Sequence, residues 1–203
     1  MADKTGNLYG TTKNFDVGCI HGCGVIVKLA PPKYSPTQIY KFTGGADGGD
    51  PDSLTTHYRA DGALILYGAT RQGGGLANAG TVFAFEPGTR ALTTLYAFAG
   101  GADGGGFGDV VYRNGALYGA TLTGGRARLG AVFRLEPAKG QTVWKKTVLH
   151  AFTGGADGGY PLMGAFDAGG ALYGVTAVGG NLVNCPADGA FPAGCGTAFK
   201  IAP

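Results

Sequence analysis

Short apolar runs separated by glycine-rich turns recur along this 203-residue chain. The runs are rich in Val, Tyr, Phe and Leu and are bounded by Gly, Pro or Asn, which is typical of short β-strands. Asn114-Gly115 separates two of them, and this dipeptide suits a tight hairpin turn. In the stretch 99–152 the pattern predicts four strands, at 109–113, 116–121, 131–136 and 147–152.

Three sequence motifs recur in the same order and at near-constant spacing. Leu-Tyr-Gly starts at Leu8, Leu66, Leu117 and Leu172, at intervals of 58, 51 and 55 residues. Phe-Thr/Ala-Gly-Gly-Ala-Asp-Gly-Gly starts at Phe42, Phe98 and Phe152. A glycine followed by an apolar alternation starts at Gly24, Gly80, Gly130 and Gly196. This register predicts a tandem repeat.

Four antiparallel strands in each unit of about 50 residues are typical of propeller blades. We therefore predict an all-β, propeller-like array of about four repeats in one domain, 1–203. An open row of stacked units and a β-sandwich are the alternatives. The expected units are 1–42, 43–98, 99–152 and 153–203.

The chain starts on the second strand of a unit and stops on the third, which gives 14 strands rather than 16. Closure of a ring by simple strand exchange is therefore not obvious. Unpaired strand edges attract partner strands. Assembly with another chain or with further repeats, as a homo-oligomer or at strand edges, is a hypothesis that follows.

Composition and charge argue against a disordered chain, a nucleic-acid-binding protein and a membrane-spanning protein. Glycine is abundant, with 41 residues, but apolar residues reach 44%, which favours turn-dense β-structure over disorder. The net charge is only +3, and Lys145-Lys146 is the nearest approach to a basic cluster, which argues against a nucleic-acid partner. No apolar stretch is long enough for a membrane span. The first residues form no signal peptide, which suits either a cytosolic protein or a mature exported one.

The repeated motifs, read together, resemble the GloVer-type extracellular tandem repeat of bacterial surface and secreted proteins, also described as choice-of-anchor tandem repeat proteins. The resemblance extends from Gly6 to Ile201. It implies an exported bacterial protein and no particular reaction. Two positions depart from the pattern: Phe107 stands where Pro51 and Pro161 keep a proline, and His150 replaces a tyrosine.

Four cysteines form two pairs, Cys19/Cys23 and Cys185/Cys195, each between the second and third strands of a unit. We favour a disulfide within each loop, although bridges between the two loops become feasible if the first and last units adjoin. His21 lies between Cys19 and Cys23, but the wide spacing of the other pair makes a zinc site the weaker hypothesis. Paired cysteines in a sequence of this resemblance indicate an oxidising, extracellular or cell-surface location.

In a meander of strands, alternate loops fall on one face. The variable loops 11–23, 69–79, 120–129 and 175–195 therefore share a face with the three Gly-Gly-Ala-Asp-Gly-Gly copies. We predict a ligand site on this face, with 175–195 setting specificity. The candidate ligand-binding residues are Asp47, Asp50, Asp52, Asp103 and Asp157.

The repeated Asp47, Asp103 and Asp157 have two interpretations. Three converging carboxylates could hold Ca²⁺, with Asp50 and Asp52 adding ligands in the first copy. Asp-Gly is also a turn dipeptide, in which the aspartate caps its own backbone. A residue present in every unit usually serves that unit, so we favour the structural role and expect no cofactor and no metal.

Catalytic residues are not identifiable. His21, His57 and His150 occupy different repeat positions, and no serine motif resembles a nucleophile elbow. We therefore favour a secreted or surface-exposed, non-catalytic module that binds a glycan or a surface partner. An extracellular carbohydrate-active hydrolase or lyase that uses carboxylates such as Asp50 and Asp52 is the first alternative. A self-assembling structural repeat protein is the second.

Overall fold

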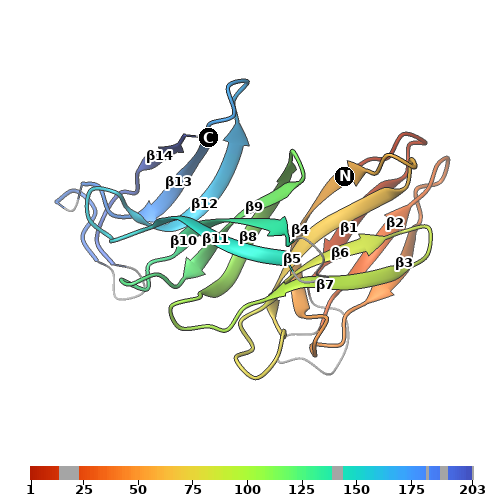
Figure 1. Cartoon of the computed structure of the whole chain (residues 1–203), viewed down its shortest axis with the longest axis horizontal. Coiled ribbons are helices and arrows are strands. Elements are labelled where there is room, and N and C mark those ends of the chain that lie inside the picture. Colours follow the sequence, from red (N-terminus) through yellow and green to blue (C-terminus); the bar gives the residue numbers. More distant parts are fainter. Residues whose placement is uncertain (14–22, 139–143, 182, 188–191, 203) are drawn as a thin grey trace.

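The computed structural model describes residues 1–13, 23–138, 144–181, 183–187 and 192–202. These residues form fourteen strands in four antiparallel sheets, which we call blades 1 to 4 (Figure 1). Blade 1 holds β1 (Leu8–Thr12), β2 (Val25–Leu29) and β3 (Pro36–Lys41), and blade 2 holds β4 (Gly49–Tyr58), β5 (Leu64–Gln72), β6 (Thr81–Glu86) and β7 (Ala91–Ala97). Blade 3 holds β8 (Gly105–Arg113), β9 (Ala116–Thr123), β10 (Ala131–Pro137) and β11 (Trp144–Ala151), and blade 4 holds β12 (Gly159–Phe166), β13 (Leu172–Val178) and β14 (Ala198–Ile201).

Each blade is a meander in which every strand pairs with the next along the chain. The first strands of blades 2, 3 and 4 lie along one side of the array, where β4 contacts β8 and β8 contacts β12. We call these three the inner strands. Blades follow each other in chain order, and Figure 1 shows blades 1 and 4 at opposite ends of an open row. The predicted all-β, propeller-like array is therefore confirmed. Across the described ranges no helix is long and apolar enough to cross a membrane.

The core lies between blades rather than inside them. In blades 1 to 3, the side that carries the tyrosine of Leu-Tyr-Gly packs against the next blade, whose opposing side carries the leucine of that motif. Between blades 2 and 3, Tyr67 and Ala69 meet Leu117, Phe133 and Leu135. Because a strand places successive side chains on opposite faces, the adjacent Leu and Tyr of one blade serve the two junctions on either side of that blade.

A phenylalanine lying over a glycine links two of the repeated motifs. In blades 2, 3 and 4 the glycine of Leu-Tyr-Gly pairs across the sheet with the phenylalanine of the following strand. A Cβ atom on the glycine would come within 2.3–2.5 Å of the phenylalanine Cζ. A side chain at the glycine would therefore displace the aromatic ring. The three pairs are Gly68 with Phe83, Gly119 with Phe133, and Gly174 with Phe199.

Blade 1 departs from this rule in a way that provides an internal control. Gly10 pairs with Val27 instead of a phenylalanine, and a Cβ atom on Gly10 would lie at an ordinary 3.9 Å from Val27 Cγ2. The smaller side chain leaves room that the other three blades lack.

Gly119→Ala is expected to lower the free energy of unfolding by about 1–3 kcal/mol, because the added methyl group must displace Phe133 from a filled core. Gly10→Ala is the matched control and should change it by much less. Chemical denaturation followed by fluorescence measures both. Equal losses in the two variants would show that the phenylalanine is not the reason for the glycine.

Candidate functional site

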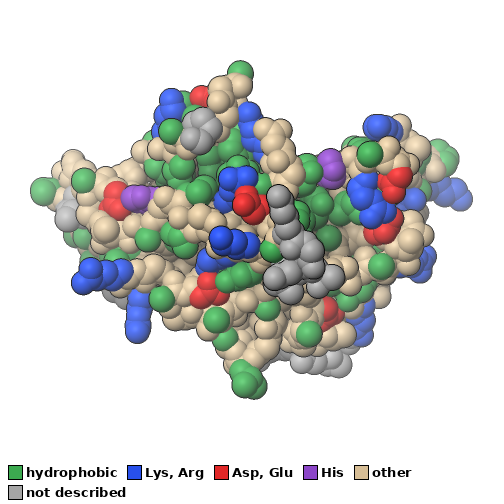
Figure 2. Space-filling view, in the orientation of Figure 1, with side chains coloured by type: hydrophobic (Ala, Val, Ile, Leu, Met, Phe, Trp, Pro, Cys, Tyr) green, Lys and Arg blue, Asp and Glu red, His purple; other side chains and the backbone are tan. Residues whose placement is uncertain are grey.

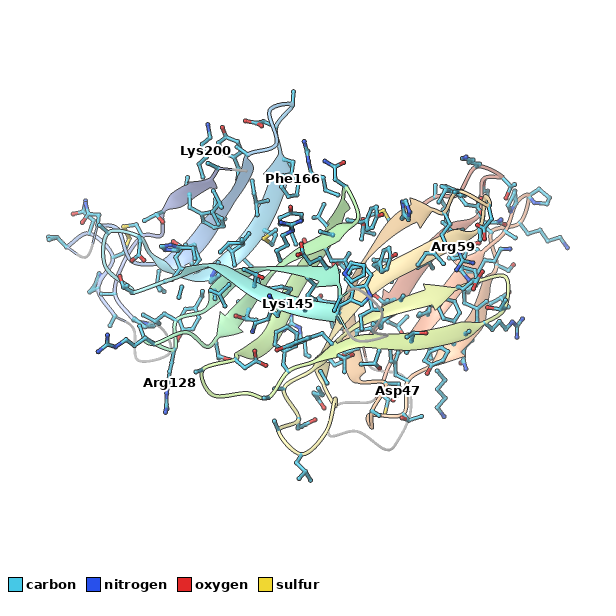
Figure 3. All side chains as sticks on the ribbon, in the orientation of Figure 1. Asp47, Arg59, Arg128, Lys145, Phe166 and Lys200 are labelled. Atoms are coloured by element: carbon cyan, nitrogen blue, oxygen red, sulfur yellow. A yellow bond between two sulfur atoms is a disulfide. The ribbon has the colours of Figure 1, made fainter. Side chains whose placement is uncertain are left out.

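The long loops and the glycine-rich loops meet on one face, as the alternation of strand direction predicts. In blades 2, 3 and 4 a backbone N–H of the long loop donates to a carbonyl of the glycine-rich loop that precedes the inner strand. The three bonds are Gly74 to Gly45 at 2.9 Å, Gly125 to Ala102 at 3.0 Å, and Gly180 to Gly155 at 2.9 Å. In Figure 3, Asp47 and Arg128 mark this loop face at the lower edge, and Phe166 and Lys200 lie toward the opposite, short-turn face.

The three repeated aspartates each bind their own turn. Every one of these carboxylates accepts a backbone N–H from the residue four positions earlier, at 2.8–3.0 Å. Each also contacts a side chain seven positions earlier, on the outer strand of the preceding blade, at 3.0–3.1 Å. The sets are Thr43 and Tyr40 with Asp47, Ala99 and Tyr96 with Asp103, and Thr153 and His150 with Asp157.

The structure therefore keeps Asp47, Asp103 and Asp157 apart, one at each blade-to-blade loop. Within the described part of the chain, no three His, Cys, Asp or Glu side chains are grouped as metal ligands would be. The contacts favour the capping role over convergence on a shared Ca²⁺ ion.

His150 departs from the repeat in identity but not in role. It occupies the position of Tyr40 and Tyr96, and its Nε2 atom lies 3.1 Å from Oδ2 of Asp157. Burial acts to raise the pKa of Asp157, but the contacts with Thr153 and His150 hold it below its usual range. The constant seven-residue spacing between a Tyr or His and the aspartate was the sequence signal for this contact.

The sequence did not indicate a structural role for Lys146. Its side chain is only 9% exposed, and Nζ lies 4.8 Å from the centre of the Phe98 ring. Nζ donates to the backbone carbonyl of Asp103 at 2.6 Å and also to its carboxylate. Lys146 thus ties blade 3 to the loop that leaves blade 2, whereas its neighbour Lys145 is exposed.

Asp52 is also engaged in the structure. Its carboxylate lies 3.0 Å from Nζ of Lys13 and 2.8 Å from the guanidinium of Arg71. Burial opposes ionisation, but these two cations hold the pKa of Asp52 below its usual range. A general acid needs a raised pKa, so Asp52 does not fit acid catalysis of glycoside cleavage. Asp50 has a φ of 55°, and its backbone N–H donates to Cys23 at 3.0 Å.

The disulfide prediction is confirmed for the last loop, in which Cys185 and Cys195 are bonded with an S–S distance of 2.05 Å. A bridge from either of them to the first loop is therefore wrong. Cys23 is also disulfide-bonded, so it is not available as a zinc thiolate. The partner predicted for it, Cys19, and the nearby His21 lie outside the described residues.

An open groove of about 440 Å³ lies between blades 1 and 2, on the short-turn face. Its walls combine a polar N-terminal segment with apolar side chains from blade 2. The lining residues are Asp3, Lys4, Thr5, Asn7, Tyr9, Lys28, Tyr58, Gly62, Leu64, Pro87 and Gly88.

The junction between blades 1 and 2 lacks one aromatic ring that the other two junctions have. On the inner strands, the residue paired with the leucine of Leu-Tyr-Gly is Tyr112 in blade 3 and Phe166 in blade 4. Tyr112 stacks on Tyr67 at 5.3 Å, and Phe166 meets the tyrosine of blade 3 at 4.9 Å. The same position in blade 2 is Thr56, which supplies no ring to cover Tyr9.

Asp3 organises the N-terminal wall of the groove. Its carboxylate accepts hydrogen bonds from the backbone and side chains of Thr5 and Asn7 and from the hydroxyl of Tyr9, all within 3.0 Å. Burial acts to raise the pKa of Asp3, yet these hydrogen bonds hold it far below its usual range. Burial and the bond to Asp3 raise the pKa of Tyr9 to about 12.

Two lysines at the groove are held by aromatic rings rather than by carboxylates. Nζ of Lys4 lies 4.3 Å from the ring centre of Tyr58, and Nζ of Lys28 lies 6.0 Å from that of Tyr9. Among the ion pairs of the described residues, neither lysine has a carboxylate partner. The groove therefore offers two lysines beside an apolar wall, and its one carboxylate among the described residues, Asp3, is engaged by hydrogen bonds to its own segment and to Tyr9. Sequence reasoning missed it because its residues come from separate segments.

The model of the Gloeobacter/Verrucomicrobia repeat matches residues 1–186. The chain belongs to this family. No curated protein matches it. Among solved structures, this chain is similar to TolB from Acinetobacter baumannii, with 13% identity and a TM-score of 0.47. The alignment covers 75% of this chain but only 32% of TolB, so the chain spans about a third of the length of that protein.

Asp103→Asn is expected to lower the free energy of unfolding at neutral pH by about 2 kcal/mol, since it removes charged hydrogen bonds. Burial acts to raise the pKa of Asp103, but Ala99, Lys146 and Tyr96 hold it below the ordinary 3.8. A lowered folded-state pKa gives stability above the unfolded value that is lost as the pH falls through the folded one.

The difference between wild type and Asp103→Asn should therefore shrink as the pH drops below 3.8. Urea unfolding across this range measures it. A difference that stayed constant in acid would show that the Asp103 charge does not contribute.

Proposed function

We propose that this repeat is a non-catalytic module that binds an acidic saccharide in the groove between blades 1 and 2. The observation that carries the proposal is the pair of lysines without carboxylate partners, Lys4 and Lys28, at the rim of an open groove of about 440 Å³. The predicted ligand site on the long-loop face stays a prediction, since its five aspartates show no shared cavity.

The groove has the chemistry that an anionic sugar needs. Tyr58, Leu64 and Pro87 give an apolar wall for the C–H face of a sugar ring. The two lysines give charge-assisted hydrogen bonds to a uronate or sulfate group. Figure 2 shows basic and acidic side chains interspersed on the visible surface. The one carboxylate of the described groove, Asp3, is engaged by five hydrogen bonds and forms no ion pair with either lysine.

Binding without catalysis fits the one carboxylate in the groove. Asp3 accepts five hydrogen bonds and its pKa is lowered, so it stays ionised and cannot deliver a proton to a leaving group. No second carboxylate lines the described groove. This supports a binding module over the hydrolase alternative.

The proposal places the protein outside the cytosol. The disulfide between Cys185 and Cys195 supports this, because such bonds persist in oxidising compartments. A saccharide of a cell surface or matrix would then be within reach.

Calorimetric titration with oligogalacturonate, against the uncharged galactan of equal length, tests the proposal. We expect binding of the acidic oligomer alone, with affinity that falls as salt screens the charges. Lys28→Ala should weaken binding about tenfold to a hundredfold, since a charged hydrogen bond is worth about 1.5–3 kcal/mol.

Lys200→Ala is the matched control. Lys200 lies over Tyr173 in blade 4 as Lys28 lies over Tyr9 in blade 1, but it does not line this groove. Equal losses from the two substitutions, or no binding of any acidic saccharide on a glycan array, would overturn the assignment.

A further inference from the structure

The two ends of the array expose surfaces that a neighbouring blade covers at the interior junctions. At the blade 1 end, Leu8 is 41% exposed, whereas its counterparts Leu66, Leu117 and Leu172 are at most 2% exposed. Val27 and Leu29, which follow on the neighbouring strand, are only half-buried. We call this surface the leucine face of blade 1.

The blade 4 end exposes the opposite kind of surface. Tyr173 is 41% exposed, whereas Tyr9 and Tyr67 are 5% and 8% exposed and Tyr118 is half-buried. Val175 is 50% exposed, although its counterparts Ala69 and Ala120 are at most 1% exposed. Residues paired across neighbouring strands lie on the same side of a sheet.

Val175 pairs with Leu162, which is also exposed, and Tyr173 pairs with Lys200. These four side chains form what we call the tyrosine face of blade 4. Lys200 lies 5.4 Å from the Tyr173 ring centre, as Arg134 lies 5.9 Å from that of Tyr118 in blade 3. Blade 4 therefore carries the same pairing of a cation with the motif tyrosine as blade 3.

We propose that the tyrosine face of blade 4 docks on the leucine face of blade 1 of a second copy of this chain. Inside the chain, a tyrosine face meets the leucine face of the next blade three times. The two uncovered faces are one of each kind, and they lie at opposite ends of the array (Figure 1). One molecule cannot join them, whereas two copies placed head to tail can. Such a heterologous contact closes a ring or extends a row.

The inner edge of blade 1 does not compete for this contact. Met1 and Tyr9 exchange two backbone hydrogen bonds, each of 2.7 Å, and Ala2 bridges to Leu8. The first residues thus pair with β1 on the side where blades 2 to 4 carry their inner strand, and the leucine face beside them is exposed. The copies therefore meet face to face rather than edge to edge.

Sedimentation velocity of the 203-residue chain up to millimolar concentration tests the proposal. We expect concentration-dependent association that Val175→Glu and Leu8→Glu each abolish. Leu76→Glu is the control, because Leu76 is fully exposed on a loop outside both faces. Circular dichroism and thermal melting verify that each variant is folded.

Mixing the two defective variants provides the decisive measurement. The Val175→Glu copy keeps its leucine face, and the Leu8→Glu copy keeps its tyrosine face, so a 1:1 mixture should form a heterodimer that grows no further. A wild-type chain that is monomeric at every concentration overturns the proposal. Association that survives Val175→Glu, as pairing along the edge of β14 would, also overturns it.

Discussion

A sheet of three or four strands cannot bury its apolar sides alone, and this constraint shapes the whole molecule. Each blade places the tyrosine and the leucine of one tripeptide on opposite sides, so each needs a neighbour in front and one behind. The phenylalanine that lies over the glycine of the same tripeptide fills the space between blades. The repeated motif consequently specifies both the strands of each blade and the contacts between neighbouring blades.

Recurrence in the repeat also distinguishes polar residues with a structural role from polar residues that are candidates for a binding site. Carboxylates that recur in every loop are occupied by their own turn, as Asp47 and Asp157 are. The groove instead lies beside the N-terminal segment around Asp3, at the junction where blade 2 has Thr56 in place of the aromatic residue of blades 3 and 4. Departures from the repeat are therefore better guides to a site than the repeated residues.

The sequence predicted a large part of the fold because its motifs are local. The four strands expected in 99–152 became β8 to β11, and the bond between Cys185 and Cys195 was expected from their place in one loop. Lys146 was not recognised, since its partner Asp103 lies 43 residues away on another blade. The groove was missed for the same reason: Tyr9 and Tyr58 meet only after blades 1 and 2 have packed.

By itself the sequence determined the number of blades, their strand order and the face that carries the long loops, because turn chemistry and side-chain alternation act over a few residues. Only the tertiary structure decided that the row stays open, that Leu8 and Tyr173 end it uncovered, and that Lys28 borders a groove. Those features depend on the angle and fit between neighbouring sheets, which arise from the packing of many side chains from distant segments.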